Sequence, residues 1–118
     1  MAILFEGAEA PLAAARVGCP LVTVSSPKGG VGKTTIARGL LVRATQLGIR
    51  AVGIDFDPQL GLKKWADQRQ ITRKAFPTFV EVRVIRGDLD DWRDALKDAA
   101  ADAEVVIADT PPSTTLAI

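Results

Sequence analysis

The sequence of 118 residues has one cysteine, no tyrosine and no long apolar run. Cys19 cannot form a disulfide within the chain, which favours a reducing compartment such as the cytoplasm. No apolar stretch approaches the roughly eighteen residues that a membrane-spanning helix needs. Residues 1–20 include Glu6 and Glu9 and lack the basic start and the apolar stretch of a signal peptide. These absences predict a cytoplasmic protein that does not bind a membrane.

The charge balance excludes a chain that attracts nucleic acid over its whole surface. The formal net charge is +1, and charged residues make up 25% of the chain. Apolar residues make up 47%, which is enough to bury a core, and the length allows one domain. Any binding to DNA would need a local basic patch or residues outside this sequence.

The apolar pattern predicts an α/β fold. Segments 51–54 and 105–108 are apolar on both faces, as in a covered parallel sheet, whereas residues 80–84 alternate and indicate a strand nearer an edge. Strands are expected at 21–24, 51–54, 80–84 and 105–108, and helices at about 36–47, 60–73 and 89–99. This order predicts a three-layer α/β/α arrangement, in which helices cover both faces of a parallel sheet.

The two ends of the chain carry weaker patterns. Residues 1–20 show no sustained period and are expected to form a leader, with a short helix at Ala10–Arg16. Residues 21–118 are expected to form the domain. Because the chain stops nine residues after Asp109, before another helix could form, we expect an incomplete sheet with one open edge. The sequence is therefore interpreted as the N-terminal part of a longer protein.

A glycine-rich segment connects the first predicted strand to the first predicted helix. Its glycines allow successive N–H groups to turn toward phosphate oxygens, and the helix adds the positive end of its dipole. Lys33 is expected to neutralise charge on the β- and γ-phosphates, and the hydroxyl of Thr34 to ligate Mg²⁺. The expected nucleotide-binding residues are Lys28, Gly29, Gly30, Val31, Gly32, Lys33, Thr34 and Thr35.

Three aspartates follow predicted strands. Asp55 and Asp57 follow the second strand and Asp109 the fourth, so all three should lie at the rim that carries the glycine-rich loop. Asp109 is expected to hold Mg²⁺ through a water molecule, and Asp55 to support the Mg²⁺ shell or the loop itself. The expected metal-binding residues are Thr34, Asp55 and Asp109. For Asp55 and Asp57 the alternative is an ordinary turn residue at a strand end.

Three ordered motifs resemble those of the ParA/MinD family of deviant Walker A ATPases. Pro27 stands where the standard loop has glycine, and Lys28 is the lysine that marks the deviant form. Residues 55–59 resemble the Asp-x-Asp-Pro-Gln stretch of ParA proteins, and residues 109–113 resemble the Asp-x-Pro-Pro-Ser signature of the same family. The resemblance covers nearly all of residues 21–118 and implies a P-loop NTPase fold.

The resemblance also implies an ATPase that uses ATP and Mg²⁺. Lys28 matches the lysine that reaches the partner's nucleotide in an ATP-dependent homodimer, and Asp57 matches the residue that orients the attacking water. The expected catalytic residues are Lys28, Lys33 and Asp57. Residues 64–66 resemble the tryptophan-bearing helix of small plasmid and chromosome partition ATPases, which bind DNA nonspecifically and are stimulated by a ParB-like partner. This implies a bacterial, nucleoid-associated protein.

Relatives with the same loop leave alternatives open. A MinD-like protein would need an amphipathic C-terminal segment that this sequence does not show, a tyrosine autokinase would need tyrosines, and an iron-protein reductase would need cluster cysteines. An inert nucleotide-binding module is a further alternative. The predicted helix at 60–73 carries more basic than acidic residues, but a solvated face is favoured over DNA contact. Its expected buried residues are Leu62, Trp65 and Ile71.

Overall fold

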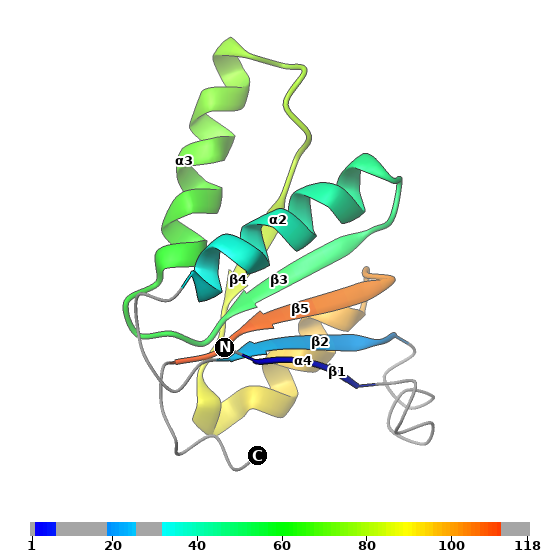
Figure 1. Ribbon diagram of the computed structural model, residues 1–118, viewed down its shortest axis with the longest axis vertical. Coiled ribbons are helices and arrows are strands. Elements are labelled where there is room, and N and C mark those ends of the chain that lie inside the picture. Colours follow the sequence, from blue (N-terminus) through cyan, green and yellow to red (C-terminus); the bar gives the residue numbers. More distant parts are fainter. Residues whose placement is uncertain (1, 7–18, 26–31, 112–118) are drawn as a thin grey trace.

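The computed structural model describes residues 2–6, 19–25 and 32–111, which form a five-stranded sheet with helices on both faces (Figure 1). The strands are β1 (Ala2–Glu6), β2 (Leu21–Ser25), β3 (Ala51–Asp55), β4 (Arg83–Arg86) and β5 (Val105–Asp109). The helices are α2 (Lys33–Gln46), α3 (Gly61–Ala75) and α4 (Trp92–Ala100), with the short 3-10 helix η1 (Leu89–Asp91) before α4. From β2 onward, strands and helices alternate as the sequence predicts.

The order of strands in the described sheet is β1-β2-β5-β3-β4. Strands β2, β5, β3 and β4 are parallel to one another, and β5 lies between β2 and β3. The two strands that are apolar on both faces, β3 and β5, are interior, because helices cover both faces of a parallel sheet. The α/β fold and the interior position of these two strands are confirmed.

Two apolar clusters lie on opposite faces of the sheet. In one cluster, residues of α2 and α3 pack against residues of the sheet and of the segment before β4: Val24, Ala37, Leu41, Leu62, Ala66, Val82, Val84 and Ile107. In the other, Ala99 of α4 packs with residues of the sheet and of two connecting segments, and the cluster consists of Cys19, Val52, Ile54, Ala99, Ala103 and Val106. The neighbours Val106 and Ile107 of β5 enter different clusters, as the alternation of a strand requires. Figure 1 shows α2 and α3 on one side of the sheet and α4 on the other, which confirms three layers.

The sheet edge beside β2 differs from the sequence analysis. Residues 2–6, expected to lie in a leader, form β1 and pair antiparallel with β2, from Ala2 opposite Ser25 to Glu6 opposite Leu21. The strand covers an edge that would otherwise expose unpaired backbone groups. Its short apolar run has no alternation that would mark a strand. The helix expected at Ala10–Arg16 lies outside the described residues.

The edge strand β4 begins three residues later than the alternating pattern predicts, at Arg83. Its position at the edge of the sheet is confirmed. The preceding backbone is held by α3 instead of by a strand. Arg69 Nε donates to the carbonyl of Val80 at 3.1 Å, and Arg73 Nε donates to that of Phe79 at 2.9 Å. These tertiary contacts delay the start of the strand, and a local pattern does not reveal them.

Helix α3 extends away from the sheet toward its C-terminal end (Figure 1). Leu62 is fully buried in the first turn, and Trp65 is half-buried. The guanidinium carbons of Arg38 in α2 and Arg69 in α3 lie 5.5 and 5.7 Å from the Trp65 ring centroid. Ile71 is 59% exposed, so the expectation that it is buried is wrong. The physical reason is that the second half of α3 has left the sheet that would cover it.

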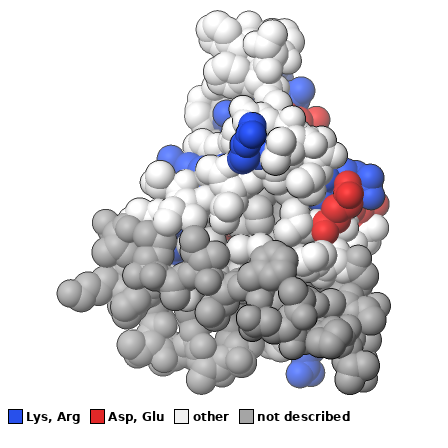
Figure 2. Space-filling model, turned by 45° about the vertical axis from the view of Figure 1, so that its right-hand side comes forward, with Lys and Arg blue, Asp and Glu red and all other residues white. Residues whose placement is uncertain are grey.

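Several basic side chains of α3 are used within the fold. Lys63 pairs with Asp67 one turn later, and Arg73 lies 3.5 Å from Glu81. Figure 2 shows Lys and Arg side chains scattered over the described part of one face, and not gathered in one patch. Lys63 and Arg73 therefore contribute to local structure through these ion pairs.

Candidate functional site

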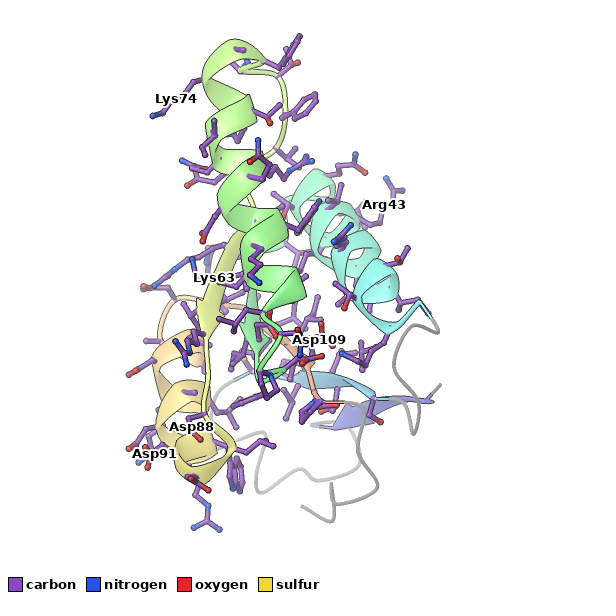
Figure 3. All side chains as sticks on the ribbon, turned by 90° about the vertical axis from the view of Figure 1, so that its left-hand side faces the viewer. Arg43, Lys63, Lys74, Asp88, Asp91 and Asp109 are labelled. Carbon is purple, nitrogen blue, oxygen red and sulfur yellow. The ribbon has the colours of Figure 1, made fainter. Side chains whose placement is uncertain are left out.

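The carboxyl ends of β2, β3 and β5 meet at one rim of the sheet. Val24 of β2 and Asp55 of β3 both lie opposite Asp109 of β5. The first turns of two helices lie at the same rim: a Cβ placed on Gly61, where α3 starts, would lie 3.8 Å from the hydroxyl of Thr34 in α2. Figure 3 shows Asp109 where β5 ends beside these helical turns. The topology therefore gathers residues that are distant in sequence.

Lys33, the first residue of α2, is a buried cation between two aspartates. Its side chain is 5% exposed. The Nζ atom donates to Oδ1 of Asp109 and lies 3.5 Å from Oδ2 of Asp57. A buried ammonium needs such partners, because removing it from water without a counter-charge is costly. Its burial therefore holds α2, the turn after β3 and the end of β5 at one point.

Asp109 is the buried carboxylate at the centre of the site. Asp109 is 0% exposed, and its second carboxylate oxygen, Oδ2, accepts a hydrogen bond of 3.2 Å from the hydroxyl of Thr34. Burial raises the pKa of Asp109 above its ordinary value, and the hydrogen bond and the charge of Lys33 oppose that rise. Both carboxylate oxygens thus face α2.

The turn that follows β3 is held by hydrogen bonds from its own backbone. Asp55 is 0% exposed and accepts from the N–H of Asp57 at 3.0 Å. Asp57 Oδ1 accepts from the N–H of Gln59 at 3.0 Å, and the Asp57 carbonyl accepts from the N–H of Leu60 at 2.9 Å. The remaining oxygen of Asp57, Oδ2, faces Lys33.

The start of α2 provides a favourable place for an anion. Gly32 precedes the helix with φ 85° and ψ 10°, a left-handed conformation that glycine adopts at little cost. Among the described residues, no side chain caps this end of the helix, and its first turn has no acidic residue. Its free N–H groups and helix dipole therefore favour a negatively charged ligand, such as a phosphate.

The expected site residues fall into three groups. Lys33 contacts Asp57 and Asp109, and Thr34 contacts Asp109, while Asp55 lies beside them and bonds the backbone. Gly32 directly precedes the helix, and Thr35 is exposed. The remaining loop residues, Lys28, Gly29, Gly30 and Val31, lie outside the described residues.

Thr110 is a buried residue beside the site to which the sequence analysis assigns no individual role. Its hydroxyl and its N–H both donate to the carbonyl of Val24, at 2.9 and 3.2 Å. The residue therefore ties the end of β5 to the end of β2. Its position directly after Asp109, inside the Asp-x-Pro-Pro-Ser motif, is the sequence signal that could have identified it.

The donor set fits Mg²⁺ better than a transition metal. Within the described ranges, no group of three or more His, Cys, Asp and Glu side chains is arranged to hold a metal ion. The hydroxyl of Thr34 and the carboxylate of Asp109 are adjacent oxygen donors. Mg²⁺ suits such a set, because it prefers oxygen and retains several waters of hydration when bound.

Comparison with known proteins agrees with this geometry. The model of the CobQ/CobB/MinD/ParA nucleotide binding domain matches residues 22–108. Maintenance of carboxysome distribution protein A of Halothiobacillus neapolitanus is 37% identical over 97 residues, which cover 82% of this chain and 42% of that protein. Chromosome partitioning protein ParA of Myxococcus xanthus is 30% identical over 126 aligned positions, which cover 79% of this chain and 44% of that protein.

The chain spans less than half the length of each of these two curated relatives. The family match nevertheless includes most of the chain, from the second residue of β2 through the last residue before Asp109. It therefore contains the glycine-rich loop, α2 and the turn after β3. On this match and on the geometry of the rim, the chain belongs to the CobQ/CobB/MinD/ParA family of nucleotide-binding domains.

Proposed function

We propose that this chain binds ATP with Mg²⁺ and hydrolyses it as part of a ParA-like positioning ATPase. The observation that carries the proposal is the contact of buried Lys33 with both Asp109 and Asp57, with Thr34 on the other oxygen of Asp109. A cation, a hydroxyl and two carboxylates are the groups that phosphoryl transfer requires. Membership of a nucleotide-binding family supports the same conclusion.

Each of these groups has a distinct role in the proposal. Lys33 would exchange its aspartate partners for oxygens of the β- and γ-phosphates, which bind at the open end of α2. Thr34 and Asp109 would hold Mg²⁺, which neutralises phosphate charge when bound. Asp57, whose side chain is 14% exposed, would orient the attacking water. Positioning and charge stabilisation supply most of the catalysis in such reactions.

Lys28 would act across an ATP-dependent homodimer. The resemblance of the loop supports this role, since the deviant lysine of the family reaches the partner's nucleotide. In such an arrangement, hydrolysis requires the partner subunit, as it does when an arginine finger is supplied in trans. Dimerisation would therefore control activity.

The proposed cargo is plasmid or chromosomal DNA. The named function of the Myxococcus xanthus relative, chromosome partitioning, supports it. The protein would then act on the nucleoid in the cytoplasm, bind DNA nonspecifically through residues largely outside this chain, and respond to a ParB-like partner. A second candidate cargo is the carboxysome, after the name of the Halothiobacillus neapolitanus relative. No helix in the described ranges is both long and apolar enough to cross a membrane.

The hydrolysis proposal is tested by phosphate release from ATP–Mg²⁺ with the full chain and its Asp57→Ala variant. We expect the variant to bind ATP and to lose turnover by about a hundredfold or more, as when a water-orienting group is removed. Asp67→Ala is the matched control, because it removes an exposed aspartate of α3 whose ion pair within the described part of the chain is with Lys63. Turnover by Asp57→Ala at the wild-type rate would remove Asp57 from the mechanism. Absence of turnover in the wild type, despite binding, would favour an inert nucleotide-binding module.

A further inference from the structure

Both carboxylate oxygens of Asp55 are occupied by backbone N–H groups. Oδ1 accepts from the N–H of Asp57 at 3.0 Å, and Oδ2 accepts from the N–H of Lys63 at 2.9 Å. Lys63 is the third residue of α3, and the first four N–H groups of a helix have no partner within it. The residue before the helix, Leu60, has no side chain that could cap it. Asp55 therefore caps α3 from eight residues earlier in the chain.

The segment between these two contacts is a tight turn with local strain. The N–H of Leu60 donates to the carbonyl of Asp57 at 2.9 Å, and Leu60 has φ 55°, in the left-handed region. A leucine in this conformation is strained, so the surrounding contacts must compensate for it. The Asp55 carboxylate provides two such contacts, one at each end of the turn. The position of Asp57 thus depends on Asp55.

The hydrogen bonds divide the acidic residues of the rim into two sets. Among the described residues, Lys33 donates to Asp109 and Asp57 and Thr34 donates to Asp109, whereas both oxygens of Asp55 accept from backbone N–H groups. Asp55 was expected to support the Mg²⁺ shell or the loop. Its two oxygens are already engaged, on the side of α3, in contacts that hold the turn. The described contacts thus place Asp55 in support of the turn after β3 and of α3, a role that the sequence analysis does not name.

We propose that Asp55 is a positioning residue and not a magnesium ligand. Its carboxylate joins the turn that carries Asp57 to the first turn of α3, and so sets the distance between the Asp57 carboxylate and Lys33. The same turn of α3 begins at Gly61, which packs toward Thr34. The consequence for hydrolysis depends on the proposed function of Asp57, whereas the structural link does not.

Amide hydrogen exchange tests the structural link. In the full chain without nucleotide, Asp55→Ala should lower the protection of the Asp57 and Lys63 amides by at least about tenfold, since both lose their acceptor. Asp55→Asn keeps one acceptor oxygen and should release only one of the two amides, so the test remains if the alanine variant does not fold. Asp67→Asn is the control, because its carboxylate contacts the Lys63 side chain and not the backbone. Unchanged protection of both amides in the Asp55 variants would overturn the proposal.

Magnesium dependence separates positioning from metal binding. In Asp55→Asn we expect kcat to fall by roughly 10- to 100-fold, as when a reacting group is displaced by about 1 Å. The KM for ATP and the half-saturating concentration of Mg²⁺ should stay within about twofold of wild type, because ground-state binding is untouched. A higher requirement for Mg²⁺ would instead identify Asp55 as a metal-binding residue and overturn the proposal. If the wild type lacks ATPase activity, the proposed function fails, and the exchange experiment still decides the role of Asp55.

Discussion

Gly87 lies directly against the ring of Phe56. A Cβ atom at position 87 would come within 2.5 Å of Phe56 Cε1 and 2.6 Å of Ile54 Cγ2. The N–H of Gly87 donates to the carbonyl of Asp55 at 2.9 Å, and the N–H of Phe56 donates to that of Asp109 at 2.8 Å. The end of β4 therefore helps to hold the turn after β3, and only glycine allows the ring to approach so closely.

Gly87→Ala is expected to destabilise the protein by about 1–3 kcal/mol, because the added methyl group must displace buried atoms. Gly39→Ala is the matched control: the same methyl group meets nothing within 4 Å on the exposed face of α2. In a helix interior this change should stabilise the protein by roughly 0.5–1 kcal/mol. Urea unfolding of both variants measures the two effects. Equal effects of the two substitutions would contradict the packing described for Gly87.

Thr110→Val is expected to destabilise the protein by about 0.5–1.5 kcal/mol, because the buried carbonyl of Val24 loses the hydrogen bond from the Thr110 hydroxyl and keeps that from its N–H. The side chains have nearly the same shape, so the change removes mainly the hydrogen bond. Thr72→Val is the control, since the Thr72 hydroxyl bonds the carbonyl of Gln68 in an exposed part of α3. A change within about 0.5 kcal/mol is expected there. If both variants lose the same stability, Thr110 does not tie β5 to β2.

The sequence was sufficient to predict the fold because each interior element has a local signature. The doubly apolar segments of β3 and β5 and the helical spacing in α2 are examples, and the structure confirms them. The proximity of Lys33 to Asp57 and Asp109 could also be predicted from the order of strands and helices, since parallel strands bring their carboxyl ends to one rim. Their chemical roles remain predictions.

Other features could not be predicted from local pattern. Strand β1 depends on pairing with β2, and the late start of β4 depends on the arginines of α3 that bond the backbone before it. The exposure of Ile71 depends on the direction in which α3 leaves the sheet. The capping of α3 by Asp55 is a contact between a side chain and a backbone eight residues away, which has no periodic signature. Each feature is set by tertiary contacts.

The stability of the ligand-free protein should depend on pH through Asp109. Because burial raises the pKa of Asp109 above 3.8, the folded state holds this proton more tightly than the unfolded state does. The stability from this group is full below pH 3.8 and is lost as the pH rises through the pKa of the folded state. The side chain of Asp109→Asn does not titrate, so the variant lacks this pH dependence.

The test is urea unfolding of wild type and Asp109→Asn at several pH values, without Mg²⁺ or nucleotide. Relative to the variant, the wild type should lose stability as the pH rises from about 4 toward neutral. A difference in stability that stays constant over this range would show that Asp109 has the same affinity for protons in both states.

Lys28→Ala should separate nucleotide binding from the dimer-dependent step. Because Lys28 is proposed to reach the partner's nucleotide, its removal should leave binding by one subunit within about threefold of wild type and lower turnover by about a hundredfold or more. Sedimentation with ATP–Mg²⁺ reports the dimer, and phosphate release reports turnover. Unchanged ATP-dependent dimers with full turnover would show that Lys28 does not act in trans.

The central claim is that Lys33, Thr34 and Asp109 form a nucleotide site, and calorimetric titration of the full chain with ATP–Mg²⁺ tests it most directly. Saturable binding of one nucleotide per chain is expected. In Lys33→Ala the affinity should fall by more than about a hundredfold, since the variant lacks the ammonium group that would contact the phosphates. Lys63→Ala, which removes a lysine paired with Asp67 on α3, should bind as the wild type does. Undiminished affinity in Lys33→Ala would contradict the phosphate-binding role of this lysine and, with it, the assignment of the site.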